Sequence, residues 1–186
     1  PKRANMQNIN DWLLDTIRED EKKGVMCGWI EEKRFLFLRD MARVISHIMN
    51  GGSLIVLTDE ARKWFGEYII QHINQPHKGR PFFPIIQIKH LHDMIDSNAQ
   101  GDVRGFKLIS NMLDMMYANY RFWYIGKKNM RASFAKSYGD GWYWIFDEND
   151  MFSPTDEHLD YKLISLFKLF DRAILAAMLN KISLDI

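Results

Sequence analysis

Asn50-Gly51-Gly52-Ser53-Leu54-Ile55-Val56-Leu57 is the stretch that decides the fold. Its two glycines are typical of a helix end, and the run that follows them is short, continuously apolar and partly β-branched. Such a run fits a strand that is covered on both faces, as strands of parallel sheets are. Residues Glu60–Ile73 then carry apolar side chains at helical spacing. The sequence therefore predicts a strand, a turn and a helix in succession.

The same alternation of strands and helices continues through the chain. Before the first strand we expect helices at Ile9–Glu21 and Glu31–Met49. After it we expect strands at Pro84–Ile88, Phe122–Ile125 and Trp142–Phe146, and helices at Gly105–Tyr117, Asn129–Tyr138 and Leu159–Lys181. This order predicts the α/β class, with a three-layer α/β/α sandwich built on a parallel sheet of four or five strands.

Length, composition and charge narrow the function classes. The chain has 186 residues, of which 47% are hydrophobic and 26% are charged, a profile typical of a folded globular protein. Its formal charge of +1 gives it no strong field for attracting nucleic-acid phosphates. We expect a single domain over residues 6–186, and we interpret residues 1–5, which precede Met6, as extraneous to the natural chain.

The cysteine content and the N-terminus bear on localisation. Cys27 is the only cysteine, so neither an intramolecular disulfide nor a Cys-rich metal site can form, and a small buried thiol is expected instead. The N-terminal residues are polar, and no apolar run approaches the roughly 18 residues that span a bilayer. We expect a cytoplasmic protein with no membrane contact.

The last expected helix contains an unusual apolar segment. Ala173–Leu179 is apolar at seven successive positions, so this half of the helix must be covered on every side. We interpret it as a sign of homo-oligomerisation, with the N-terminal and C-terminal helices in the oligomer contacts. The alternative is that the two N-terminal helices of the same chain cover it.

In an open α/β sheet, ligand-binding groups are expected in the turns after the strands. The first turn, Thr58–Arg62, has no glycine to let backbone N–H groups approach a phosphate, and its two carboxylates suit a helix start. The alternative is an anion held by Thr58 and Arg62. The later turn Gly126–Asn129 suits anions better, although its lysines are more typical of solvated surface charge.

Catalytic and metal-binding patterns are weak. His90-Leu91-His92-Asp93 has metal-like spacing if the segment is extended, because both imidazoles would then lie on one side. No clear third ligand accompanies them, and no nucleophile elbow, Walker loop or zinc-protease motif occurs. We therefore expect no catalytic residue, no cofactor and no metal.

Aromatic residues, which make up 13% of the chain, are the other candidates for a functional surface. Candidates for contacts with a protein partner lie near the second helix start and after the first strand: Trp29, Phe35, Phe37, Trp64 and Phe65. The alternative for each of them is packing in the core or in a homo-oligomer.

Two longer segments resemble a known family. Ile45–Val56 and Leu159–Phe170, together with Gly28–Glu31 and the ending Leu179–Lys181, are similar to the HobA family. The resemblance implies a flavodoxin-like sheet with flanking helices and a non-enzymatic homotetramer. It also implies an adaptor that binds the N-terminal domain of the initiator DnaA and promotes its ordered assembly at the chromosomal origin. DNA would be contacted only indirectly, through DnaA.

Two rival functions stay open at this point. The helix, glycine pair and strand are also similar to sugar isomerase (SIS) domains, to which HobA and its functional counterpart DiaA are structurally related. Those domains follow the strand with a glycine- and serine-rich loop, whereas this chain has Thr58–Arg62. The first rival is thus a sugar-phosphate-binding SIS-type isomerase or regulatory domain. The second is direct DNA binding through Lys127, Lys128, Arg131 and Lys136.

Overall fold

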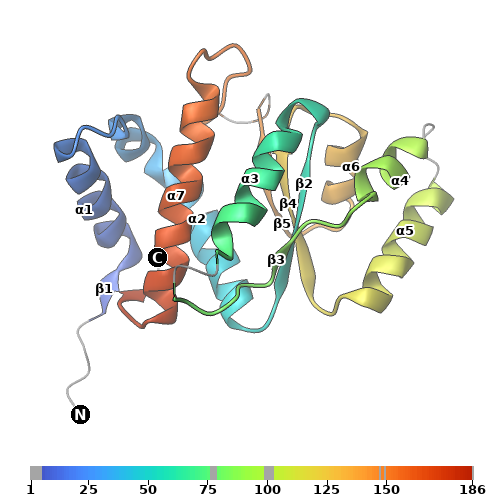
Figure 1. Cartoon of the computed structure of the whole chain (residues 1–186), viewed down its shortest axis with the longest axis horizontal. Coiled ribbons are helices and arrows are strands. Elements are labelled where there is room, and N and C mark those ends of the chain that lie inside the picture. Colours follow the sequence, from blue (N-terminus) through green and yellow to red (C-terminus); the bar gives the residue numbers. More distant parts are fainter. Residues whose placement is uncertain (1–5, 76–78, 99–102, 147, 149, 186) are drawn as a thin grey trace. The chain divides into compact units, whose positions relative to one another are not determined.

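The computed structural model describes residues 6–75, 79–98, 103–146, 148 and 150–185 (Figure 1). Residues 1–5, interpreted above as extraneous, lie outside this range. The chain divides into two compact units, one made of residues 1–49 and 155–186 and the other of residues 50–154. The expected single domain over residues 6–186 stays a prediction.

The first unit combines three helices with a very short parallel sheet. Its elements are α1 (Ile9–Lys22), α2 (Gly28–Met49), α7 (Leu159–Met178), β1 (Gln7–Asn8) and β6 (Ile182–Ser183). The helices α1, α2 and α7 contact one another. Ile9, Leu13 and Ile17 recur every fourth residue and are fully buried, so α1 presents one apolar stripe. The α1 N-terminus is capped by the Asn8 side chain, which accepts the Asn10 N–H at 2.8 Å.

The apolar segment of α7 is mostly buried within one chain. Ala173, Ile174, Ala176 and Ala177 are buried, and only Leu179 at the helix end is exposed. The expectation that a second subunit is needed to cover this segment is therefore wrong, because the chain itself provides the cover. Homo-oligomerisation through the terminal helices stays a prediction, but the apolar segment of α7 no longer supports it.

The second unit contains a four-stranded sheet in which all strands are parallel, in the order β3-β2-β4-β5. The strands are β2 (Ser53–Thr58), β3 (Ile85–Ile86), β4 (Tyr120–Gly126) and β5 (Gly141–Ile145). The helices are the 3-10 turn η1 (Glu60–Arg62), α3 (Lys63–Ile73), α4 (Leu91–Ser97), α5 (Val103–Met116) and α6 (Met130–Lys136).

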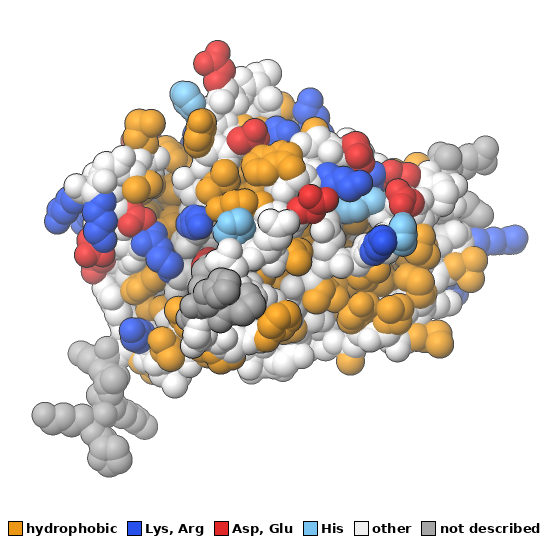
Figure 2. All heavy atoms as spheres, viewed as in Figure 1, with side chains coloured by type: hydrophobic (Ala, Val, Ile, Leu, Met, Phe, Trp, Pro, Cys, Tyr) orange, Lys and Arg blue, Asp and Glu red, His pale blue; other side chains and the backbone are white. Residues whose placement is uncertain are grey.

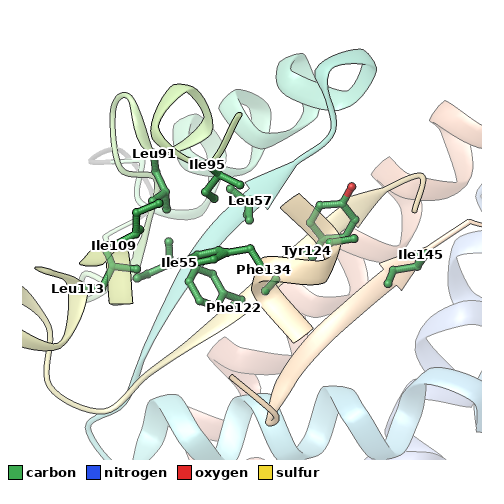
Figure 3. Close-up of a cluster of buried hydrophobic side chains, with 12 residues drawn as sticks. Ile55, Leu57, Leu91, Ile95, Ile109, Leu113, Phe122, Tyr124, Phe134 and Ile145 are labelled. Carbon is green, nitrogen blue, oxygen red and sulfur yellow. The ribbon is translucent and has the colours of Figure 1, made fainter. Parts of the chain in front are cut away.

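Helices cover both faces of this sheet. On one face, side chains of alternate strand residues meet α4, α5 and α6 in a single buried cluster; Figure 3 labels Ile55, Phe122 and Phe134 among its members. On the other face lie Trp123 and Trp144, and Phe65 of α3 stacks on Trp144 with ring centroids 6.4 Å apart. The α/β class and the three-layer sandwich on a four-stranded parallel sheet are thus confirmed.

Some element bounds differ from the expectation. The helix α2 begins at Gly28, three residues earlier than predicted, and only two residues of β3 pair with β2. The helix α4 was missed altogether. It follows His90, whose backbone has a left-handed φ of 67°, and that sharp turn starts the helix at Leu91.

Candidate functional site

The order of the strands locates the crevice in which such sheets usually bind ligands. From β2 the chain proceeds to β3 on one side, and then crosses to β4 on the other side. In open α/β sheets, ligands bind outside the carboxyl ends of the strands at this change of direction. In this chain those ends are Thr58 of β2 and Gly126 of β4.

The crevice is occupied by a carboxylate of the chain itself. The Asp59 side chain accepts the Arg62 N–H at 2.8 Å and the Lys127 N–H at 2.7 Å. These two N–H groups belong to the turns after β2 and after β4. They would be available to a bound anion if Asp59 were absent. Asp59 is buried, so its carboxylate fills the position that a phosphate would need.

Gly126 gives this carboxylate its room. Its backbone has a φ of +148°, and a Cβ at this position would lie 2.5 Å from Asp59 Cγ. No real Cβ approaches another carbon so closely, and the backbone conformation is itself one that favours glycine. The close packing of the two turns therefore depends on glycine at position 126.

Arg131 closes the same end of the sheet from α6. Its side chain is only 6% exposed, and its Nη1 donates to the Thr58 carbonyl at 2.9 Å. Its Nε donates to Asp96 of α4 at 2.9 Å, and Nη2 donates to Glu60 at 3.1 Å. Hydrogen bonding to Arg131 holds the pKa of the Asp96 carboxyl below its ordinary value. One guanidinium thus connects α6, α4 and the turn after β2.

His92 of α4 completes this arrangement. Its Nε2 accepts the Thr58 N–H at 3.1 Å, and burial, followed by the nearby Arg131 charge, lowers the pKa of the imidazole. The Thr58 backbone therefore has both its N–H and its carbonyl bonded to side chains of the chain itself. The backbone donors of Thr58 and Arg62 are therefore already bonded within the chain, which disfavours the alternative in which these two residues hold an anion through them.

Two side chains of the lysine-rich turn after β4 (Gly126–Asn129), those of Lys128 and Asn129, also have partners within the chain. Asn129 caps α6 by accepting the Ala132 N–H at 3.0 Å. Lys128 lies 3.5 Å from Glu148, and Lys136 forms an ion pair with the same carboxylate. Since Arg131 is buried between carboxylates as well, three of the four cations that direct DNA binding would require are neutralised. These four residues therefore do not form a free basic patch.

The metal-like spacing of His90 and His92 does not form a metal site in the folded chain. His90 and His92 do not lie on one extended segment, because α4 begins at Leu91 and turns the two imidazoles to different partners. Among the described residues, no three His, Cys, Asp or Glu side chains are grouped as metal ligands. Cys27 is buried, and burial raises the pKa of its thiol, which disfavours the reactive thiolate.

Of the three partner-contact candidates in the first unit, Phe35 lies on the surface, Trp29 is half-buried and Phe37 lies in the core. Phe35 is 66% exposed, and the Arg34 guanidinium lies 4.1 Å from the centre of its ring. Trp29 is half-buried, with the Lys162 ammonium 5.1 Å from its ring centre. Phe37 is buried at 3% exposed and faces the core. Its side chain offers no surface to a partner, so this candidate is corrected to a core residue.

The candidates of the second unit separate in the same way. Trp64, at the start of α3, is 38% exposed, whereas Phe65 is fully buried and packs on Tyr68 and Trp144. Phe65 is therefore corrected to a core residue too. Trp29, Phe35 and Trp64 stay predictions as partner contacts.

Other exposed apolar side chains were missed in the sequence. Figure 2 shows hydrophobic side chains gathered over the region of β3 and α5. The exposed ones in this part of the chain are Phe82, Val103, Leu108, Met115 and Met116. The available signal was in α5, where apolar residues outnumber the positions that one buried stripe needs.

Together, the fold and the filled crevice define a class of protein. It is a three-layer α/β protein of the SIS-like kind that lacks a phosphate-binding loop at the carboxyl ends of β2 and β4. Among the described residues, no helix has the length and apolar character needed to cross a membrane.

Comparison with known proteins identifies the family. Residues 6–184 match the HobA family, described as a DNA replication regulator. The DNA replication regulator protein HobA of Helicobacter pylori is 33% identical over 193 aligned positions, which cover 96% of this chain and 100% of that protein. The chain belongs to the HobA family, as its sequence motifs indicated.

Two solved structures are similar over nearly the whole chain. One is the crystal structure of a HobA–DnaA (domain I–II) complex from Helicobacter pylori, with a TM-score of 0.73, 31% identity and coverage of 96% of this chain and 99% of that one. The other is the crystal structure of HobA from the same organism, with a TM-score of 0.67, 31% identity and coverage of 95% and 99%.

Proposed function

We propose that this chain is a non-enzymatic adaptor that binds the N-terminal domain of DnaA and promotes the ordered assembly of DnaA at the chromosomal origin. One observation carries the proposal: a chain 31% identical to this one, aligned over 96% of its length, is solved in complex with DnaA domains I–II. At this identity and coverage, the two chains share a fold on which the same partner can be accommodated.

The surface supports a protein partner. Phe35 and Trp64 expose aromatic rings to solvent, and the exposed side chains of α5 add Leu108, Met115 and Met116. Aromatic residues and methionine are enriched in protein interfaces, where a few of them account for most of the binding energy. We infer that the initiator covers some of these side chains.

The filled crevice supports a role without catalysis. Asp59 and Arg131 occupy the carboxyl ends of β2 and β4 with hydrogen bonds inside the chain. A sugar phosphate placed there would meet the Asp59 carboxylate and would have to break these bonds. The structure therefore offers no observation in favour of the isomerase alternative at this position.

The scaffold mechanism requires more than one copy of the chain. A homotetramer would hold several DnaA N-terminal domains close together and raise their effective concentration without any new contact to DNA. DNA would then be reached only through DnaA. The expected place of action is the cytoplasm.

Titration calorimetry with the isolated N-terminal domain of DnaA from the same source tests this proposal. We expect saturable binding with a Kd in the micromolar range or tighter, and weaker binding for Phe35→Ala or Trp64→Ala. The control is Lys181→Gln, an exposed lysine after α7 that forms no ion pair within the described residues. Absence of heat at protein concentrations of hundreds of micromolar would refute the proposal.

A further inference from the structure

A second cavity lies beside the filled crevice and is not part of it. It has a volume of about 400 Å³ and is lined by residues of α3, of the segment after β3 and of the start of α4. Figure 2 shows cationic, acidic and histidine side chains gathered over the region between α3 and α4. The turn after β2 does not line this cavity, so its ligand would not meet Asp59.

His92 supplies the most buried polar group of the cavity wall. It is 8% exposed, and its Nε2 accepts the Thr58 N–H at 3.1 Å. A neutral imidazole that accepts through Nε2 carries its proton on Nδ1, so the hydrogen bond fixes the tautomer. The structure gives Nδ1 no partner among the described residues. The ring therefore offers one oriented N–H donor to a ligand.

Two lysines add positive charge to the same wall. Lys63 stands at the first position of α3, and Lys89 follows β3. Neither forms an ion pair within the described part of the chain, in contrast to Lys128, Lys136 and Lys162. Their ammonium groups are thus available for an anionic ligand group.

Two acidic residues line the same wall, so the cavity presents charges of both signs. Asp93 is already engaged, with its carboxylate 3.3 Å from His90 Nδ1. Glu67, one helical turn after Lys63 in α3, is the remaining carboxylate, and Gln87 provides a neutral amide. These two side chains can bond hydroxyl or amine groups of a ligand whose anionic group lies at the lysines.

We propose that this cavity binds a small polar molecule through a phosphate or carboxylate group held by Lys63, Lys89 and His92 Nδ1–H. Three donors around one anionic group match the acceptor oxygens of either chemistry. The volume exceeds that of an inorganic ion, so the rest of the molecule lies against Glu67 and Gln87. The site would add a ligand to a protein for which none is expected at the strand-end crevice.

Titration calorimetry on the whole chain, with inorganic phosphate, glycerol 3-phosphate, malate and neutral glycerol as probes, tests the proposal. We expect saturable binding of at least one anionic probe in the millimolar range or tighter, and none of glycerol. Binding of the phosphate probes assigns the site to phosphorylated ligands, whereas binding of malate alone assigns it to carboxylates. Failure of all three anionic probes to bind at tens of millimolar would overturn the proposal.

Three variants place the binding in this cavity. Lys63→Gln with Lys89→Gln should weaken binding roughly fivefold or more, because two exposed charge contacts are lost. Glu67→Ala should weaken the binding of glycerol 3-phosphate and malate, because the carboxylate that bonds their hydroxyl groups is lost, and should not weaken the binding of inorganic phosphate. Lys107→Gln removes one equivalent charge from α5 and should leave the affinity unchanged. These lysines are exposed, so the fold is expected to persist, which circular dichroism verifies. Equal affinities in all of these proteins would place the anion elsewhere and contradict the assignment.

Discussion

Arg131 and Asp96 join α6 to α4 through two parallel hydrogen bonds, one of which connects Nε to Oδ1 at 2.9 Å. The guanidinium is buried, whereas the carboxylate is about half exposed. The pair is therefore not a fully buried ion pair. Its importance lies in the two further bonds of the same guanidinium, to Thr58 and Glu60, which tie the helices to the carboxyl end of β2.

Replacing this arginine tests how firmly the crevice is closed. Arg131→Leu should lower the free energy of unfolding by about 2 to 3 kcal/mol, because charge-assisted hydrogen bonds are lost while the carboxylates stay partly solvated. Urea denaturation measures the change. Lys107→Gln serves as the control and should stay within about 0.5 kcal/mol of the parent chain. Equal stabilities for the Arg131 variant and the control would mean that the network does not hold the helices.

The contact between Gly126 and Asp59 makes a second prediction. Gly126→Ala should destabilise the chain by about 3 kcal/mol, since it combines a strained backbone with a clash against the Asp59 carboxylate. Gly139→Ala is the matched variant: its φ is +79°, and no heavy atom lies within 4 Å of the added Cβ. It should cost about 1 kcal/mol from backbone strain alone. Similar costs for the two variants, measured by urea denaturation, would exclude a role for the clash.

His92 predicts a dependence of stability on pH. Burial lowers the pKa of its imidazole in the folded chain below 6.5, as does the Arg131 charge, while Asp96 and Glu60 oppose the effect. Below pH 6.5 the unfolded chain therefore binds a proton that the folded chain resists. Stability should fall as the pH drops from 6.5 toward the lowered pKa.

The variant His92→Gln isolates this contribution. Glutamine can still accept the Thr58 N–H but does not titrate, so its stability should decline less steeply between pH 7.5 and 5.5. Urea denaturation at several pH values within this window provides the comparison. The depressed carboxyl pKa values of Asp96 and Glu148 act at lower pH, because their ordinary values are 3.8 and 4.5. Parallel curves for the two proteins would contradict the role of His92.

Phe35 is exposed and Phe37 is buried in the same helix, so replacing each by alanine compares a surface position with a core position. Phe35→Ala should change the free energy of unfolding by less than about 0.5 kcal/mol, while Phe37→Ala should cost about 3 to 4 kcal/mol. If Phe35 contacts the initiator, its variant should in addition bind the DnaA N-terminal domain at least tenfold more weakly, as a central interface aromatic does. Denaturation and calorimetry on the same two variants check both statements. A large loss of stability for Phe35→Ala would instead place this ring in the fold.

The local sequence pattern was sufficient to predict most of the helices and strands. Residues Leu54–Leu57 of β2 are apolar without interruption because helices cover both faces of the sheet, and that pattern is visible in one sequence. The helix α4 was not visible, because seven residues are too few for a clear helical period and its start depends on the left-handed turn at His90. The pairing of only two β3 residues likewise depends on the neighbouring strand rather than on the segment itself.

The candidate site was predicted only in part. The carboxylates after β2 were correctly interpreted as a helix start, since Asp59 caps η1 by accepting the Arg62 N–H. The bonds of Arg131 could not be foreseen, because its partners lie 35 and 71 positions away along the chain. Phe37 and Phe65 were misplaced on the surface for a similar reason: each lies beside a more exposed aromatic of the same helix, and periodicity alone did not decide which of the two is buried.

The most direct test of the account is light scattering after size-exclusion chromatography, on the chain alone and mixed with the N-terminal domain of DnaA from the same source. We predict a homotetramer that gains mass on mixing, with several initiator domains bound to each tetramer. A species that gains no mass at micromolar concentrations would contradict the proposed adaptor function. A monomer that binds one DnaA domain would retain the partner but contradict the scaffold.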